Sequence, residues 1–200
     1  MLVSVLLAPL AAAAETCPAT PAALPASPLF AQDDPRLAAG TAVVIEKELR
    51  LGMVFVGGRL ATDAAGAPAC WHVALAAPYV AGHKRRQGDH RTPEGWYRLS
   101  DRPWSAFPHA LTVHYPAPAD AVRGLAASLI DQAQHDAILA AATADVAPPE
   151  STRLGGQILL HGGGGAADWT LGCVGFDDDA ILTVRALLTP DLRGDVLILP

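Results

Sequence analysis

The sequence lacks the excess of basic charge that nucleic-acid binding requires. Its 200 residues include 14 Lys and Arg against 20 Asp and Glu, so the formal net charge is −6. It has no basic tail or stripe, and the short run at 84–86 is interpreted as a solvated loop. Because nucleic-acid binding depends on clustered positive charge, we do not expect nucleic acid as a partner.

No segment after the N-terminus is apolar enough to span a membrane, so we expect no stable membrane span. The first 14 residues are apolar but too short to cross a bilayer as a mature helix. The small residues Ala12–Ala14 suit a cleavage site, and we interpret residues 1–14 as a signal peptide. An apolar N-terminal tail is the alternative, and the missing basic region is compatible with a true start further upstream. The signal predicts export to the periplasm or the exterior.

Cysteine is scarce, with Cys17, Cys70 and Cys173 as the three examples. Exported proteins fold in an oxidising compartment, where Cys17 and Cys70 can pair. Cys173 then remains as an odd thiol, which is typical of a reactive cysteine. From the sequence alone this pairing is a hypothesis, and an unpaired Cys17 is the alternative.

Motifs for metal binding are absent as well. The nearest group of ligand types is His83 with Asp89 and His90, and its spacing matches no zinc motif. We therefore expect no metal and no other cofactor. A zinc-dependent peptidase is the weaker alternative.

The composition predicts one folded domain. The chain is 51% hydrophobic and long enough to bury a sizeable core. Residues 15–39 are rich in Pro and Ala and are interpreted as a linker. Residues 40–200 are then the folded domain.

The apolar pattern predicts an α+β fold that consists mostly of strands. Apolar and β-branched runs predict strands at 41–45, 49–56, 71–75, 111–114, 157–160 and 196–199. Apolar residues at helical spacing predict one longer helix over 120–142, which Asp120 would cap. A short helix at 180–188 follows the acidic cap Asp177–Asp179.

The segment from His161 to Cys173 carries the strongest chemical signal. An apolar strand ends at His161, the glycines at 162–165 follow, and Cys173 closes the loop after Gly172. Catalysis by a cysteine needs a thiolate and a base that accepts the thiol proton. The segment therefore predicts a nucleophile and its base. An inert core cysteine beside a strand-end histidine is the alternative.

Two blocks in this order resemble the L,D-transpeptidase catalytic domain, a YkuD-type family of bacterial cell-wall enzymes. The first block is Gly88-Asp89 with the Thr-Pro-Glu-Gly turn at 92–95, and the second is His161-Gly162 with the Trp-Thr-Leu-Gly-Cys run at 169–173. The resemblance covers roughly residues 40–200 and is greatest to the YafK-like murein transpeptidase branch. It implies the YkuD-type fold, a mixed β-sandwich.

The sequence also departs from the family pattern near the cysteine. Leu171 stands where many members have a second histidine, and Val174 to Phe176 stand where many have an arginine or asparagine. These positions are expected near the substrate. The final acceptor and the outcome of the reaction are therefore left open.

The resemblance implies a peptidoglycan stem tetrapeptide as substrate. Cys173 would attack the carbonyl of its third residue, release D-alanine and form a thioester. An amine of another stem would give a 3→3 cross-link, and a lysine of a wall-anchored lipoprotein would give a protein–wall bond. Water would instead make the enzyme a hydrolase that releases such a lipoprotein. A non-catalytic wall-binding module is a third, weaker alternative.

The catalytic roles follow from the residue types. His161 is the expected general acid and base, since its pKa suits both tasks. The backbone N–H groups of Gly172 and Cys173 would form an oxyanion hole. Thr170 is expected to support the loop by a hydrogen bond, with a plain turn residue as the alternative.

Two residues are expected to bind substrate. Gly162 follows the histidine in the family motif, and Arg91 can bind a carboxylate through its guanidinium group. For Arg91 a solvated surface position is the alternative.

Overall fold

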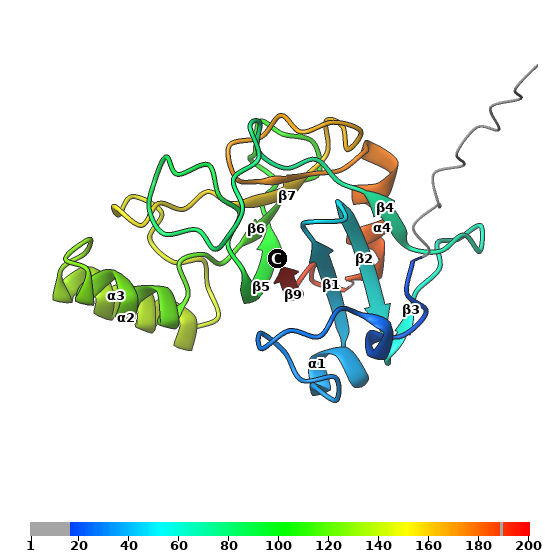
Figure 1. Cartoon of the computed structure of the whole chain (residues 1–200), viewed down its shortest axis with the longest axis horizontal. Coiled ribbons are helices and arrows are strands. Elements are labelled where there is room, and N and C mark those ends of the chain that lie inside the picture. The colour runs from blue at the N-terminus through cyan, green and yellow to red at the C-terminus, as the bar shows by residue number, and fades with distance from the viewer. Residues whose placement is uncertain (1–16, 189) are drawn as a thin grey trace, which may run out of the picture.

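The computed structural model describes residues 17–188 and 190–200 (Figure 1). The predicted signal at 1–14 lies outside the described residues. Within the described ranges, no helix is long and apolar enough to cross a membrane.

The described chain contains short helices and strands in an α+β order. The helices are the 3-10 helix η1 (Pro21–Ala23), α1 (Pro35–Ala38), α2 (Pro118–Ala126), α3 (Gln132–Thr143) and α4 (Asp178–Leu187). The strands are β1 (Thr41–Glu46), β2 (Leu51–Val56), β3 (Arg59–Leu60), β4 (Cys70–His72), β5 (Gly95–Asp101), β6 (Leu111–Val113), β7 (Leu159–His161), β8 (Val174–Gly175) and β9 (Gly194–Leu199). The predicted fold class, α+β with a mixed sheet and few helices, is confirmed.

The nine strands of the described residues form one mixed sheet in the order β3-β2-β1-β9-β5-β6-β7-β8, with β4 paired to β2. The pairs β1–β9 and β7–β8 are parallel, and the other named pairs are antiparallel. A bridge between Ala74, just after β4, and Gly175 in β8 brings the two ends of the sheet together. The sheet therefore curls around its own core.

Both faces of β1 are buried, which explains its continuous apolar sequence. Val43 and Ile45 enter the main core, which also contains residues of β5, β6, β7 and α4. Ala42 and Val44 point to the opposite face and join a second core. Successive side chains of β1 thus point alternately into the two cores.

The segment 17–39 covers that second face, and the predicted linker is wrong for these residues. Leu24 and Leu37 are 4% and 0% exposed and pack against β1, β2 and β9. Cys17 forms a disulfide with Cys70 at the start of β4, as the sequence hypothesis proposed. Prolines here permit short turns rather than a free arm, because the leucines between them find apolar partners.

The single helix predicted over 120–142 is wrong, because the structure divides it into α2 and α3. Ser128 has a φ of 55°, a left-handed conformation that ends α2. Asp131 then starts α3 by accepting a hydrogen bond from the N–H of Gln134 at 2.8 Å. Asp120 is not the N-cap residue of α2, but from the first turn its buried carboxylate caps the helix start by accepting the N–H of Ala117 at 2.9 Å. The helical spacing of the apolar residues continues across the break between α2 and α3, so the sequence pattern did not reveal the break.

Loss of the Cys17–Cys70 disulfide should destabilise the fold. The bond closes a loop with a sequence separation of 53 residues, and removing such a link typically costs about 2–5 kcal/mol. We expect Cys17→Ser/Cys70→Ser, made in a Cys173→Ala background, to unfold at lower urea concentration than the background alone. Reductant should shift the background and leave the double variant unchanged. Equal unfolding free energies would contradict this packing of the N-terminal segment.

Candidate active site

Parallel pairing of β7 and β8 places Cys173 next to His161. Leu160 pairs with Val174, so the same register puts Cys173 beside Leu159, two residues before His161. Alternate residues of a strand face the same side. Cys173 comes just before β8, and we infer that its side chain lies on the same face of the sheet as that of His161. Strand spacings separate their Cα atoms by about 8 Å, which is within reach of the two side chains.

His161 is buried and held in a defined orientation. Its Nδ1 lies 2.6 Å from the carbonyl oxygen of Gly162, and because a carbonyl only accepts, Nδ1 carries the proton. Nε2 is then the basic nitrogen. Phe107 stacks on the imidazole at 4.3 Å between ring centroids, and Trp169 meets it edge-on at 5.3 Å. Burial lowers the pKa of His161, and the Gly162 hydrogen bond only partly opposes this.

Cys173 is half-buried and has its own backbone partners. Its thiol donates to the carbonyl oxygen of Gln157 at 3.5 Å. Burial raises the pKa of the Cys173 thiol above its ordinary value, against a smaller effect of the Leu159 N–H, which favours the thiolate. With the pKa of His161 lowered, the resting site holds a neutral thiol and a neutral imidazole.

Thr170 links the residues that precede the cysteine. Its Oγ1 donates to the carbonyl of Cys173 at 2.8 Å and accepts from the N–H of Gly172 at 3.2 Å. Gly172 has a φ of +129°, and a Cβ there would lie 2.8 Å from the carbonyl oxygen of Arg91. Glycine is therefore required at 172 by conformation and by space. Of the two expected oxyanion donors, the Gly172 N–H is already engaged in the resting loop.

The first part of the loop, after His161, is held by two aspartates at the start of α4. Gly163 and Gly165 donate their N–H groups to Asp178 and Asp177, each at 2.8 Å. These carboxylates, predicted as caps of α4, thus hold the glycine loop; Asp177 makes no side-chain cap bond. Gly162 donates to Pro108, and a Cβ on it would lie 2.3 Å from an oxygen of Asp178. The structure therefore gives Gly162 an orienting and packing role at the site where substrate contact was expected.

A clamp holds the middle of the loop. Asp168 accepts hydrogen bonds from the guanidinium of Arg50 at 2.9–3.2 Å and from the N–H of Leu75 at 2.8 Å. The carbonyl of Leu75 accepts from the N–H groups of Trp169 and Thr170, both at 2.9 Å. Asp168 therefore ties the loop to the segment after β4. The hydrogen bonds from Arg50 and Leu75 outweigh burial and lower the pKa of Asp168.

An open cleft of about 680 Å³ adjoins the cysteine through Gln157. Arg102 and Glu150 line it and form a two-point ion pair, at 2.7 and 3.1 Å. Gln87 and Trp104 line it too. Its lining is mostly polar, which suits the backbone of a bound peptide.

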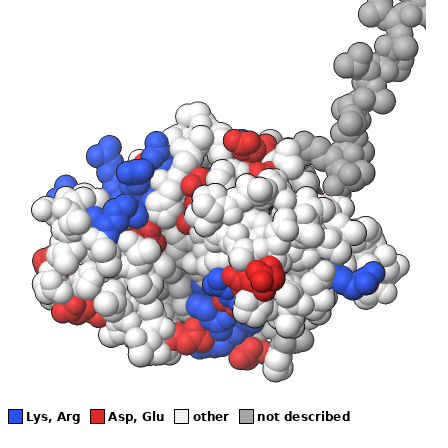
Figure 2. Space-filling view, turned by 60° about the horizontal axis from the view of Figure 1, so that its bottom comes forward, with Lys and Arg blue, Asp and Glu red and all other residues white. Residues whose placement is uncertain are grey.

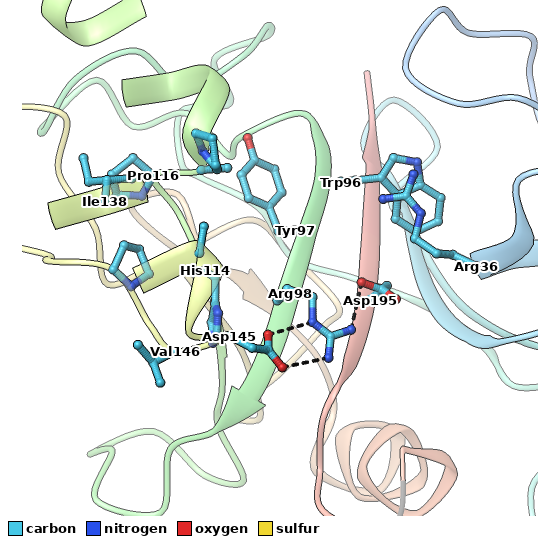
Figure 3. Close-up of a pocket in the computed structure, with 14 residues that line it drawn as sticks. Arg36, Trp96, Tyr97, Arg98, His114, Pro116, Ile138, Asp145, Val146 and Asp195 are labelled. Carbon is cyan, nitrogen blue, oxygen red and sulfur yellow. Dashed lines mark hydrogen bonds and ion pairs between the residues drawn. The ribbon is translucent and has the colours of Figure 1, made fainter. Parts of the chain in front are cut away.

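A smaller cavity of about 140 Å³ lies away from this site, among β5, α3 and α1 (Figure 3). Neither Cys173 nor His161 lines it. Arg98 spans it with ion pairs to Asp145 and Asp195 at 2.9 and 3.0 Å. Its charges are compensated, and it offers no nucleophile.

Arg91 lies behind the cysteine loop. Its backbone contacts Gly172, and its Nε is buried without a hydrogen-bond partner in the described part of the chain.

The weaker alternative from the sequence was a zinc-dependent peptidase. Within residues 17–188 and 190–200, no group of three His, Cys, Asp or Glu could hold a metal ion.

Several residues that shape the site gave little sequence signal. Arg50 is 118 residues from Asp168, and no local pattern connects the two. Phe107 is 54 residues from His161 in the sequence, and its stacking on the imidazole depends on the fold. Gln157, with a φ of 57°, also gave no signal.

Comparison with protein families gives one match over most of the chain. The model of the L,D-transpeptidase catalytic domain (YkuD) matches residues 40–195. No curated protein matches the sequence.

Solved structures with a similar fold come from bacteria. The helical cell shape determining protein Pgp2 from Campylobacter jejuni has a TM-score of 0.51 at 17% identity, covering 79% of this chain and 46% of that chain. Bd1075 from Bdellovibrio bacteriovorus has a TM-score of 0.45 at 20% identity, covering 80% and 48%. An L,D-transpeptidase from Xylanimonas cellulosilytica has 0.42 at 14%, covering 82% and 62%. The chain thus spans about half the length of the first two.

The reactivity of Cys173 with an alkylating agent should follow the titration of a thiol whose pKa is raised. Because burial holds its pKa above the ordinary 9.0, the thiolate fraction grows about tenfold per pH unit up to that range. We expect the rate of iodoacetamide alkylation to rise with pH without a plateau below about pH 9. Cys173→Ala is the control and should not react. A plateau near neutral pH would indicate a thiolate–imidazolium pair instead.

Removal of the Phe107 ring should raise the pKa of His161. Burial disfavours the imidazolium, so exposing the ring in Phe107→Ala moves the pKa upward, toward the ordinary 6.5. An NMR titration of the imidazole signals measures this. Trp104→Ala is the matched control, since Trp104 is 75% exposed and makes no ring contact with His161 among the described residues. An unchanged pKa in Phe107→Ala would refute the proposed shielding.

Proposed function

Because the chain belongs to the L,D-transpeptidase catalytic domain family, we propose that it is a cysteine-dependent acyltransferase acting on the stem peptides of peptidoglycan. The observation that supports this proposal is the register of β7 and β8, which brings the backbone just before β8, at Cys173, close to the end of β7 at His161. A nucleophile and a base need that proximity.

In the first half-reaction, Cys173 is the nucleophile. A stem tetrapeptide binds along the cleft at Gln157 with its third carbonyl near the sulfur. The thiol proton passes to Nε2 of His161 as the sulfur–carbon bond forms. The tetrahedral intermediate collapses, the bond to the terminal D-alanine breaks, and His161 returns the proton to the leaving amine. A thioester and free D-alanine result.

Neutral resting groups suit this sequence. A neutral imidazole has a lone pair for the thiol proton, and the Gly162 carbonyl stabilises the imidazolium that forms, because it accepts from Nδ1. His161 therefore removes the thiol proton during the attack, and the site does not hold a thiolate beforehand. The Gly172 N–H would leave Thr170 Oγ1 if it turns toward the oxyanion.

In the second half-reaction an amine attacks the thioester. Its nitrogen gives a proton to His161 as the new amide bond forms, and the sulfur leaves and takes that proton from His161. We propose a stem amine, giving a 3→3 cross-link, with a lysine of a wall-anchored lipoprotein as the second acceptor. The same thioester attacked by water would make the enzyme a hydrolase of such bonds.

We also propose that the protein acts outside the inner membrane, where this substrate lies. The Cys17–Cys70 disulfide supports this location, because structural disulfides persist in oxidising compartments. The predicted signal peptide at 1–14 supports it independently.

Muropeptide analysis tests the proposed function. Sacculi that still carry attached lipoprotein are incubated with wild type, with Cys173→Ala and with His161→Ala, and the products are identified by mass spectrometry. We expect new 3→3 dimers or new protein–stem bonds with the wild type and none with Cys173→Ala. His161→Ala should lose about 10²–10⁴-fold in rate, the usual effect of losing a general base.

The controls separate the alternatives. Lipoprotein release without new bonds would identify a hydrolase. Loss of activity with a chelator would favour a zinc enzyme. Binding to sacculi without any covalent product would favour a wall-binding module and overturn the proposal.

A further inference from the structure

Two exposed arginines line a cavity near the cleft at Gln157. Arg86 and Arg153 line a cavity of about 380 Å³ together with Gln87, Gly88 and Leu129. Neither guanidinium has an ion pair or hydrogen bond within the part of the chain that the structure describes. In the space-filling view, one group of Lys and Arg side chains lies at the upper left, and other Lys and Arg side chains lie at the lower centre, beside Asp and Glu, and at the right (Figure 2).

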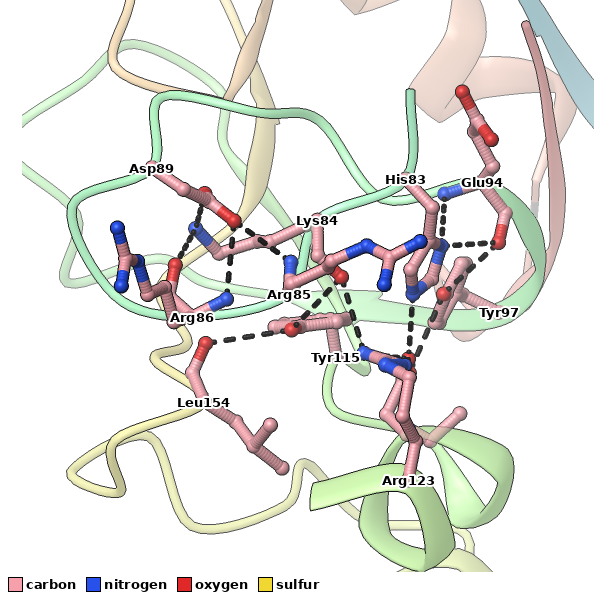
Figure 4. Close-up of polar contacts among 12 residues, drawn as sticks. His83, Lys84, Arg85, Arg86, Asp89, Glu94, Tyr97, Tyr115, Arg123 and Leu154 are labelled. Atoms are coloured by element: carbon pink, nitrogen blue, oxygen red, sulfur yellow. Dashed lines mark hydrogen bonds and ion pairs between the residues drawn. The ribbon is translucent and has the colours of Figure 1, made fainter. Parts of the chain in front are cut away.

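The loop that presents Arg86 is held rigidly by a buried carboxylate. Asp89 accepts hydrogen bonds from the N–H groups of Arg85 and Arg86, at 2.7 and 3.0 Å, and from Nζ of Lys84 at 2.9 Å (Figure 4). Burial alone would raise the pKa of Asp89, but these hydrogen bonds lower it and keep the carboxylate charged. The backbone at Arg86 is therefore in place before a ligand arrives.

A direct hydrogen bond joins the two arginine loops. The N–H of Gln87 donates to the carbonyl oxygen of Arg153 at 3.0 Å. A Cβ on Gly155 would lie 3.1 Å from Cα of Gln87, so the two loops are closely packed. Arg86 and Arg153 are held as a pair by their backbones, and their side chains stay free.

This cavity shares a lining residue with the cleft beside the cysteine. Gln87 lines both cavities, and Gln157, whose carbonyl accepts the Cys173 thiol, lines the cleft. Gly155 is two residues from Gln157, at most about 7 Å along the chain. Gln157 contacts the sulfur and Gln87 lines the cavity of the arginines, and an extended tetrapeptide, which spans about 13 Å, is the ligand that we expect to lie across both.

The charge balance favours an anion at this end. The cations nearer the cysteine have their own carboxylates: Lys84 pairs with Asp89, and Arg102 pairs with Glu150. Arg86 and Arg153 have none among residues 17–188 and 190–200. In a chain with a net charge of −6, two uncompensated guanidinium groups beside a peptide-sized cleft form a specific positive site.

We propose that Arg86 and Arg153 form a carboxylate-binding subsite for the anionic peptide that Cys173 attacks. The subsite holds carboxylates of the stem peptide while its chain lies extended across Gln157 and Gln87. This inference rests on the proposed function and deepens it, since it assigns the recognition of substrate charge to residues outside the catalytic loop.

A binding experiment tests the subsite apart from the chemistry. In a Cys173→Ala background, the probe is a synthetic stem tetrapeptide with free carboxylates, and its fully amidated analogue is the comparison. We expect Arg86→Gln/Arg153→Gln to weaken binding of the free-carboxylate peptide about 3- to 10-fold at low salt, the usual range for two accessible ion pairs. The amidated peptide should bind parent and variant equally, and added salt should narrow the difference.

Arg59→Gln/Arg85→Gln is the charge-matched control. Arg59 lies on β3 and is exposed, and the side chain of Arg85 points away from that of Arg86 (Figure 4). Binding like that of the parent is expected for this control. An equal loss in both double variants would mean a net-charge effect only and would overturn the subsite. Unchanged binding in Arg86→Gln/Arg153→Gln would overturn it as well.

The experiment also distinguishes the two levels of the proposal. Charge-dependent peptide binding through these arginines, with no thioester in the wild type, would refute the proposed function and leave the subsite standing. A thioester in the wild type, with unchanged binding in Arg86→Gln/Arg153→Gln, would refute only the subsite.

Discussion

The parallel pairing of β7 with β8 is the constraint on which the whole site depends. The two strands are three and two residues long, so they contribute few ladder hydrogen bonds of their own. Their register nevertheless decides whether Cys173 and His161 share a face, because a shift of one residue would move the thiol to the opposite side. The connecting loop is therefore held from outside: Asp168 with Arg50 and Leu75 holds its middle, and Asp177 and Asp178 hold its start.

Stacked rings around His161 have a chemical consequence as well as a packing one. Phe107 and Trp169 exclude water from the imidazole, which lowers its pKa and leaves it neutral. The same low-dielectric surroundings raise the pKa of Cys173. Burial therefore acts on both partners in the direction of the uncharged pair, and proton transfer must accompany attack rather than precede it. The orientation of His161 by the Gly162 carbonyl prepares that transfer without adding a second charge.

Local sequence patterns revealed the parts of the fold that depend on neighbours in the chain. The apolar runs of β1, β2 and β9, the short helix α4 and the His161–Cys173 loop all carry their signal within a few residues. The break between α2 and α3 was missed because Ser128 takes a left-handed conformation that serine rarely adopts, while the apolar spacing continues past it. The Pro/Ala-rich segment was read as a linker because its composition hides Leu24 and Leu37, whose burial depends on a sheet face formed elsewhere. Arg50 and Phe107 could not be assigned for the same reason: their partners are distant in sequence.

The distribution of positive charge follows from what the cysteine requires. A free cation beside Cys173 would lower the pKa of the thiol and create a standing thiolate. Lys84 and Arg102 act on the sulfur in that direction, but Asp89 and Glu150 pair with them and reduce their effect. Burial then dominates, and the thiol stays protonated. An anionic peptide still needs positive charge to bind. Arg86 and Arg153, which have no ion pair among the described residues, line a separate cavity, and they are absent from the charges that act on the sulfur. Recognition of the substrate's charge and control of the nucleophile's charge are in this way assigned to two cavities that share Gln87.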